Sequence, residues 1–141
     1  MNVRSERDYS GRSLFEKLGV FAEAHVALVG RNDETFVTVL NARLAKAASQ
    51  ALRTRYDLIF VRIDSRRDLG RLARAAPHLK PDGALWVFHP KGRGASPSDA
   101  EVRAAGIAAG LVDNKISAYN DSHTATRFVI PLARRTSSRD R

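Results

Sequence analysis

Residues 57–64 read DLIFVRID, and the centre of this run, LIFV, is continuously apolar. An unbroken apolar centre is typical of a strand buried on both faces, as the strands of parallel sheets are. Two other short apolar runs have the same character: HVALVG at residues 25–30 and ALWVFH at residues 84–89. We therefore expect three buried strands, with a turn at the glycine that ends the first.

Helical segments separate these strands. Periodic apolar positions and cap residues predict helices over residues 13–18, 35–53, 65–76 and 98–109. The turn KPDG at residues 80–83 precedes the third strand, and a glycine-rich basic loop at residues 90–97 follows it. Two final strands, at residues 111–119 and 124–132, are joined by a four-residue link that suits an antiparallel hairpin.

Strands that alternate with helices form a parallel sheet with right-handed crossovers. The sequence therefore predicts the α/β class, with a three-layer, Rossmann-like and mostly parallel sheet of about five strands that ends in a C-terminal antiparallel hairpin. One domain, at residues 13–133, accounts for most of the 141 residues. We expect a flexible segment at residues 1–12 and a basic, disordered tail at residues 134–141.

The composition is strongly basic and lacks cysteine. With 24 Lys and Arg against 15 Asp and Glu, the net charge is +9, which favours anionic partners such as nucleic acid, nucleotides or an acidic protein surface. The absence of cysteine excludes disulfides, thiolate nucleophiles and cysteine metal sites. The four histidines lack H-x-x-x-H spacing, so we expect no metal. No signal peptide or membrane span is visible, so we expect a cytoplasmic protein without membrane contact.

Three segments together resemble class I methyltransferases. They are YDLIF at residues 56–60, LKPDGALWV at residues 79–87, and AAGLV at residues 108–112 followed by the hairpin. The resemblance covers about residues 24–133. It implies a methyltransferase-like fold, in which S-adenosylmethionine binds beyond the carboxyl ends of the strands.

The chain is also similar to a family of short bacterial proteins of unknown function. The motifs that carry this second resemblance are YSG at residues 9–11, KLG at 17–19, VALVG at 26–30, FVR at 60–62 and PDG at 81–83. This similarity indicates relatives but implies no activity.

The turn after the first strand departs from the methyltransferase pattern. Methyltransferases carry G-x-G-x-G there, because glycines let the backbone approach the cofactor, whereas this turn reads GRNDE at residues 30–34. A strand ending in a ribose-binding acid is expected next, but none is visible between Asn32 and Asp57. We therefore predict no cofactor. The loss leaves the strand edge at residues 26–29 exposed unless a homodimer contact or the amino-terminal segment covers it.

Candidate site residues follow the first three strands, whose carboxyl ends meet at one edge of a parallel sheet. The predicted ligand-binding rim consists of Gly30, Arg31, Asp33, Asp64, His89 and Lys91. His89 and Asp64 are the catalytic candidates, because histidine titrates near neutrality and a carboxylate can assist it. Lys91 and Arg93 lie among glycines and can hold a phosphate. In the alternative, structural interpretation, Asp64 helps to cap the next helix, His89 is a satisfied strand-end residue, and the basic loop is solvated.

An arginine stripe forms a second candidate surface. Arg67, Arg71 and Arg74 fall at i, i+4 and i+7 on one face of the helix that follows Ser65. This spacing predicts contact with an anion or nucleic acid, or else an ordinary solvated helix face. No helix-turn-helix or RNA-binding signature accompanies the stripe.

These observations favour a non-catalytic binding or regulatory domain on a truncated methyltransferase-like fold. Its partner would be an anionic ligand or an acidic protein surface. Two alternatives stay open: a nucleic-acid-binding protein that uses the arginine-rich face, and a small enzyme or residual S-adenosylmethionine-dependent methyltransferase.

Overall fold

A computed structural model describes residues 12–139 of the chain. Its core is one five-stranded mixed sheet with the strand order β1-β2-β3-β5-β4. The strands are β1 (Val26–Val29), β2 (Tyr56–Arg62), β3 (Leu79–Pro90), β4 (Val112–Ala118) and β5 (His123–Val129). The first three are parallel, and β5 pairs antiparallel with both β3 and β4. The predicted α/β fold with a C-terminal antiparallel hairpin is thereby confirmed.

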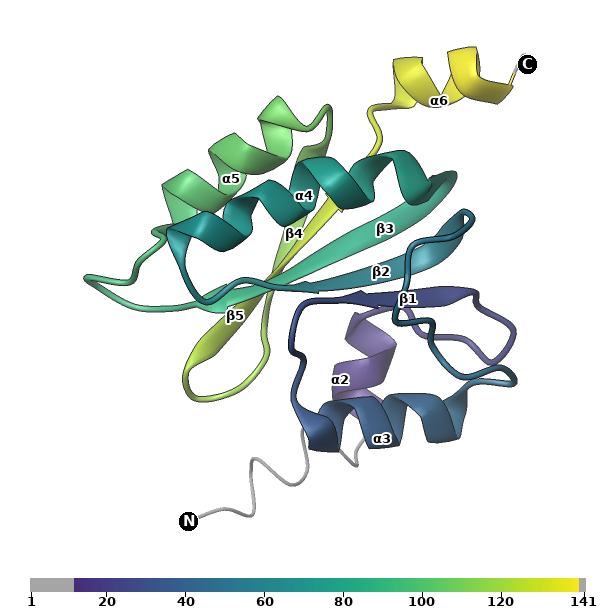
Figure 1. Cartoon of the computed structure of the whole chain (residues 1–141), viewed down its shortest axis with the longest axis horizontal. Coiled ribbons are helices and arrows are strands. Elements are labelled where there is room, and N and C mark those ends of the chain that lie inside the picture. The colour runs from purple at the N-terminus through teal and green to yellow at the C-terminus, as the bar shows by residue number, and fades with distance from the viewer. Residues whose placement is uncertain (1–11, 140–141) are drawn as a thin grey trace.

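Helices cover both faces of the sheet and make three layers (Figure 1). Helices α2 (Arg12–Lys17) and α3 (Glu34–Arg43) lie on one face. Helices α4 (Gly70–Ala75) and α5 (Asp99–Ala108) lie on the other, and short 3-10 turns flank α4 on both sides. The cap of α5 explains its start, because Ser98 and Glu101 form a reciprocal capping box.

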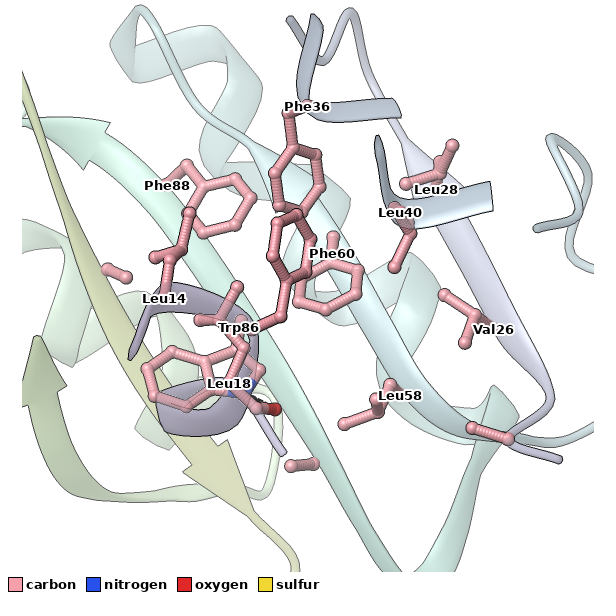
Figure 2. Close-up of a cluster of buried hydrophobic side chains, with 14 of the residues drawn as sticks. Leu14, Leu18, Val26, Leu28, Phe36, Leu40, Leu58, Phe60, Trp86 and Phe88 are labelled. Atoms are coloured by element: carbon pink, nitrogen blue, oxygen red, sulfur yellow. Dashed lines mark hydrogen bonds between the residues drawn. The ribbon is translucent and has the colours of Figure 1, made fainter. Parts of the chain in front are cut away.

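The side chains of the strands alternate between two hydrophobic layers. Phe60 and Phe88 point into the layer under α2 and α3, whereas Val61 and Val87 point into the layer under α4 and α5. In the first layer the indole nitrogen of Trp86 donates to the Leu18 carbonyl at 3.0 Å, which ties α2 to the sheet (Figure 2). Burial on both faces explains why the sequences of the parallel strands are continuously apolar.

The predicted helix over residues 35–53 is too long, because α3 ends at Arg43 and Leu44 is already extended. The chain then turns back along β1. Ser49 bridges Ala27, donating its N–H to the Val26 carbonyl and accepting from Leu28 at the same 2.8 Å. Unpaired backbone groups at a sheet edge need hydrogen-bond partners. Pairing with β1 therefore outweighs the helix preference of the alanine-rich segment. The edge of β1 is therefore covered from within the same chain.

The predicted turn at residues 80–83 is a bulge inside β3. Tyr56 pairs with Leu79, and Leu58 pairs with Ala84. Residues 80–83 therefore lie opposite the single residue Asp57. A Cβ at Gly83 would lie 2.8 Å from the Asp57 carbonyl oxygen, which explains why a glycine occupies this position. The third strand is consequently longer at its start than the sequence predicts.

The tail predicted to be disordered contains helix α6 (Leu132–Arg139), which extends away from the sheet (Figure 1). Pro131 starts it, since its carbonyl accepts the N–H groups of Arg134 and Arg135. The guanidinium of Arg134 also donates to the Gly110 carbonyl at 2.7 Å, which fixes the first turn. At the other end, Arg12 begins α2, and the rest of the predicted flexible segment lies outside the described residues.

Candidate functional site

The carboxyl ends of β1, β2 and β3 meet at one edge of the sheet, as parallel strands require. The turn after β1 is tight: Gly30 has φ +86°, and a Cβ there would lie 3.0 Å from the Arg62 carbonyl and 2.6 Å from the Arg71 guanidinium. Only glycine combines this dihedral with so close an approach. Gly30 therefore brings the start of α3 against the end of β2.

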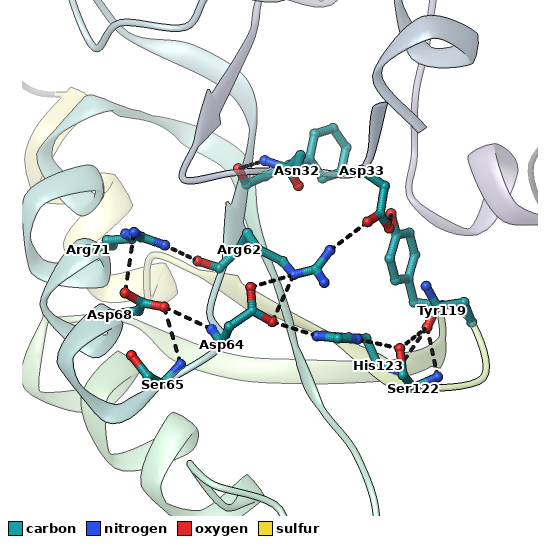
Figure 3. Close-up of polar contacts among 12 residues, drawn as sticks. Asn32, Asp33, Arg62, Asp64, Ser65, Asp68, Arg71, Tyr119, Ser122 and His123 are labelled. Carbon is teal, nitrogen blue, oxygen red and sulfur yellow. Dashed lines mark hydrogen bonds and ion pairs between the residues drawn. The ribbon is translucent and has the colours of Figure 1, made fainter. Parts of the chain in front are cut away.

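Arg62, the last residue of β2, is the centre of a polar network at this edge (Figure 3). Its Nη1 contacts Asp33 Oδ1 at 3.1 Å, and its Nε contacts both oxygens of Asp64 at 3.1 Å. The Arg62 side chain is only 12% exposed. Burial alone would lower the pKa of Arg62, but the two carboxylates outweigh it and hold the pKa above its ordinary value.

Tyr119 links this network to the hydrophobic core. Its hydroxyl donates to the second oxygen of Asp33 at 2.9 Å. Its buried ring stacks on Phe88, with the centroids 4.0 Å apart. The position of Asp33, just before α3, is thus set both by Arg62 and by a side chain from the C-terminal hairpin (Figure 3).

His123 approaches Asp64 from the hairpin. Its Nε2 lies 2.8 Å from Asp64 Oδ1, and its Nδ1 lies 2.7 Å from the Ser122 hydroxyl. Partial burial would raise the pKa of Asp64, but hydrogen bonds from His123 and Arg62 outweigh it, so the pKa lies below its ordinary value. Asp64 is therefore a carboxylate at neutral pH.

Arg71 and Asp68 brace the other side of the network. The Asp68 carboxylate accepts the backbone N–H groups of Asp64 and Ser65, at 2.9 and 3.2 Å. Arg71 pairs with Asp68 at 3.2 Å and donates to the Arg62 carbonyl at 2.6 Å. The backbone around Asp64 is consequently held from two directions, and the carboxylate of Asp64 itself stays available for His123.

His89 lies in a different environment from Asp64. It is buried, its Nε2 lies 2.8 Å from the Thr126 hydroxyl, and its Nδ1 lies 3.7 Å from Asp99. Burial lowers the pKa of His89 despite the opposing charge of Asp99. The structure thus pairs Asp64 with His123, and His89 with Thr126.

The remaining predicted residues are placed at the margins of this network. Arg31 and Lys91 are exposed, and the Lys91 N–H donates to the Ser122 carbonyl at 3.1 Å. Arg67, in the 3-10 turn Arg66–Leu69, and Arg74, in α4, are exposed, whereas Arg71 turns inward to Arg62. The arginine stripe is therefore split between the surface and the network.

Five residues of the network were not predicted from the sequence: Arg62, Asp68, Tyr119, Ser122 and His123. Arg62 had a usable signal, because residues two apart on a strand share a side, and Arg62 and Asp64 are two apart. The polar link before β5 was a weaker signal for Ser122 and His123. Nothing near Tyr119 in the sequence indicates its contact with Asp33.

The residues at this edge do not fit S-adenosylmethionine. The fold family requires an acid on the segment beside β1 to hold the ribose hydroxyls. That place is taken by residues 44–52, LAKAASQAL, which contain no carboxylate and pair with β1 through Ser49. Within residues 12–139, no group of three or more His, Asp or Glu side chains is arranged to hold a metal, and no helix has the length and apolar character to cross a membrane.

Solved structures of methyltransferases share this fold. Magnesium protoporphyrin IX methyltransferase from Synechocystis PCC 6803, with bound S-adenosylmethionine, matches with a TM-score of 0.64 and 11% identity over 91% of this chain and 82% of that one. An S-adenosylmethionine-dependent methyltransferase from Clostridium acetobutylicum matches with a TM-score of 0.62 and 10% identity over 91% and 94%.

A methyltransferase of calicheamicin biosynthesis matches with a TM-score of 0.61 and 17% identity, over 90% of this chain and 54% of that one. No protein-family model and no curated protein matches the chain. At these identities the similarity shows a methyltransferase-like fold and no more.

Proposed function

We propose that this chain is a binding domain that works without S-adenosylmethionine and takes a small anionic ligand at the carboxyl ends of its parallel strands. One observation carries the proposal: the segment beside β1 lacks the ribose-binding acid and is hydrogen bonded to the strand through Ser49. In open α/β sheets the ligand crevice lies at this same strand end, which supports a ligand there that does not need the cofactor contact.

The charge of this edge supports an anionic ligand. Arg31 follows β1 and Lys91 follows β3, and both are exposed there. Arg62 is engaged by two carboxylates, so the outer cations and not Arg62 would meet the ligand. A net charge of +9 adds a long-range attraction for anions.

A ligand titration followed by thermal unfolding tests this proposal. We expect pyrophosphate to raise the melting temperature saturably in the full chain, and S-adenosylmethionine and S-adenosylhomocysteine to leave it unchanged. The double variant Arg31→Gln/Lys91→Gln should lose the pyrophosphate effect. Lys46→Gln, an exposed lysine at the opposite end of β1, is the matched control and should keep it.

The alternative is an S-adenosylmethionine-dependent methyltransferase, the class to which the solved structures of this fold belong. The same titration separates the two. Saturable stabilisation by S-adenosylmethionine at micromolar concentration would overturn the proposal and favour the alternative.

A further inference from the structure

We propose that Ser122, His123 and Asp64 form a nucleophile–base–carboxylate relay at the tip of the hairpin, able to attack an activated carboxylic ester. The three side chains are joined in one line at the strand-end edge (Figure 3). This proposal goes beyond the anion-binding role and does not depend on it.

The carboxylate fixes the tautomer of His123. An ionised carboxylate only accepts hydrogen bonds, so the contact of 2.8 Å between Asp64 and His123 places the ring proton on Nε2. The other ring nitrogen, Nδ1, then carries a free lone pair. In the neutral ring, Nδ1 at 2.7 Å accepts from the Ser122 hydroxyl, and this is the arrangement of a base that activates a serine.

The Ser122 hydroxyl also contacts Asn120 Oδ1, but its contact to His123 is the shorter of the two. Asn120 Oδ1 already accepts the backbone N–H groups of Ser122 and His123, at 2.9 and 2.8 Å. These two donors use both lone pairs of the amide oxygen, and the Ser122 hydroxyl lies farther from it, at 3.2 Å. The hydroxyl is thus directed to His123 while the Asn120 contacts hold the turn in shape.

The attacking serine of the relay is exposed to solvent, and the histidine behind it is buried. Ser122 is exposed, so an ester can reach its oxygen, whereas His123 is 8% exposed. Arg62 Nε contacts both oxygens of Asp64, including the Oδ1 that also contacts His123, and helps to keep the carboxylate charged. His123 therefore acts as the base, and Asp64 is a positioning residue.

The reaction balances without any further reagent. Ser122 Oγ bonds to the carbonyl carbon of the ester while its proton moves to His123 Nδ1. The bond to the leaving alcohol oxygen then breaks, and that oxygen takes the proton from His123. A water molecule repeats the two steps, releasing the acid and restoring the serine.

Covalent labelling of the full chain tests the relay. We expect a fluorophosphonate probe to modify Ser122, located by peptide mass spectrometry, and p-nitrophenyl acetate to acylate the same residue. Ser122→Ala should abolish both. His123→Gln should slow acylation by roughly 100-fold or more, the scale of a general base. Ser96→Ala, a second exposed loop serine, is the matched control and should react as the unaltered chain does.

Asp64→Asn separates a positioning role from a structural one. It should slow acylation at least about tenfold while the circular dichroism spectrum stays native, because an amide no longer fixes the tautomer of His123. If His123→Gln fails to fold, the acylation rate of Asp64→Asn still tests the relay. An unlabelled Ser122 in the folded chain, or equal labelling in Asp64→Asn, would overturn the relay whatever the pyrophosphate titration shows.

Discussion

The two hydrophobic layers on either side of the sheet differ in composition and in how they meet the polar surface. The layer under α2 and α3 is aromatic, and Phe36 contacts four rings in it, with centroids 5.2 to 5.6 Å away. The layer under α4 and α5 is mostly aliphatic. We call them the aromatic layer and the aliphatic layer.

The two layers also differ in what a polar side chain at the strand-end edge contacts. In the aromatic layer, the Tyr119 hydroxyl reaches Asp33 and so joins the ion-pair network. On the α4 and α5 side, His89 stays within the fold and contacts Thr126 and Asp99. We therefore expect packing of the aromatic layer to be coupled directly to the site through Tyr119, and packing of the aliphatic layer to be coupled to it more weakly.

The largest expected effect is the loss of Phe36. Phe36→Ala should lower the free energy of unfolding by about 3–5 kcal/mol, because it leaves a cavity and removes all four ring contacts. Leu72→Ala, a fully buried residue of the aliphatic layer, is the matched substitution and should cost less. Denaturant unfolding of both variants measures the difference. An equal or greater loss of unfolding free energy for Leu72→Ala would contradict the larger contribution that we assign to the aromatic layer.

The next effect concerns a close approach in the aliphatic layer. A Cβ at Gly106 in α5 would lie 2.1 Å from the buried Phe128 ring, so Gly106→Ala should destabilise by about 2 kcal/mol although alanine favours helices. A Cβ at Gly70 in α4 would meet no atom within 4 Å, and Gly70→Ala should be neutral or stabilising by up to about 1 kcal/mol. Thermal unfolding of the pair checks the sign of each change.

How far the sequence predicts this molecule depends on whether a feature is local. The strand cores were correct because a doubly buried strand is apolar in its own residues, as at 58–61. The helix predicted over 35–53 was too long because Ser49, beyond its end, pairs with β1, a strand from another part of the chain. Helix propensity is local and weak, and a sheet edge overrides it.

The site shows the same limit. Asp33 and Asp64 were predicted from their places after strands, and both lie in the network. Their partners from the hairpin, Tyr119 and His123, are 86 and 59 residues away in sequence. Pairing over such separations depends on the register between β3 and β5, which the sequence pattern does not specify. His89 was predicted as the partner of Asp64 because it ends a strand, and the histidine that the structure places 2.8 Å from Asp64 is His123.

A smaller change tests the coupling of the aromatic layer to the site. Tyr119→Phe keeps the stacked ring and removes the hydroxyl that donates to Asp33, so it should cost about 1.5 kcal/mol, as hydrogen bonds to charged groups do. A double-mutant cycle with Asp33→Asn isolates the interaction. If the two substitutions are additive, the hydroxyl does not link the core to the network, and the two layers do not differ in their coupling to the site.

The smallest effect is the pH dependence that His89 contributes. Burial lowers the pKa of His89 below 6.5, and His123 acts in the same direction while Asp99 opposes it. The unfolded chain therefore binds the proton more readily than the folded one, so this contribution to stability is present above pH 6.5 and is lost as the pH falls toward the lowered value. The slope should stay below about 1.4 kcal/mol per pH unit.

Denaturant unfolding between pH 7.5 and 5 measures this slope in the unaltered chain and in His89→Gln, which removes the titrating group. The variant should show a shallower loss of stability on acidification. Asp99→Asn should show a greater total loss, because it removes the charge that favours protonated His89 and so widens the pH interval over which stability falls. Asp64 does not interfere in this interval, since its pKa lies below 3.8. Identical slopes in the unaltered chain and in His89→Gln would mean that His89 is protonated as easily in the folded state as in the unfolded state. Burial in the aliphatic layer would then not lower the pKa of His89.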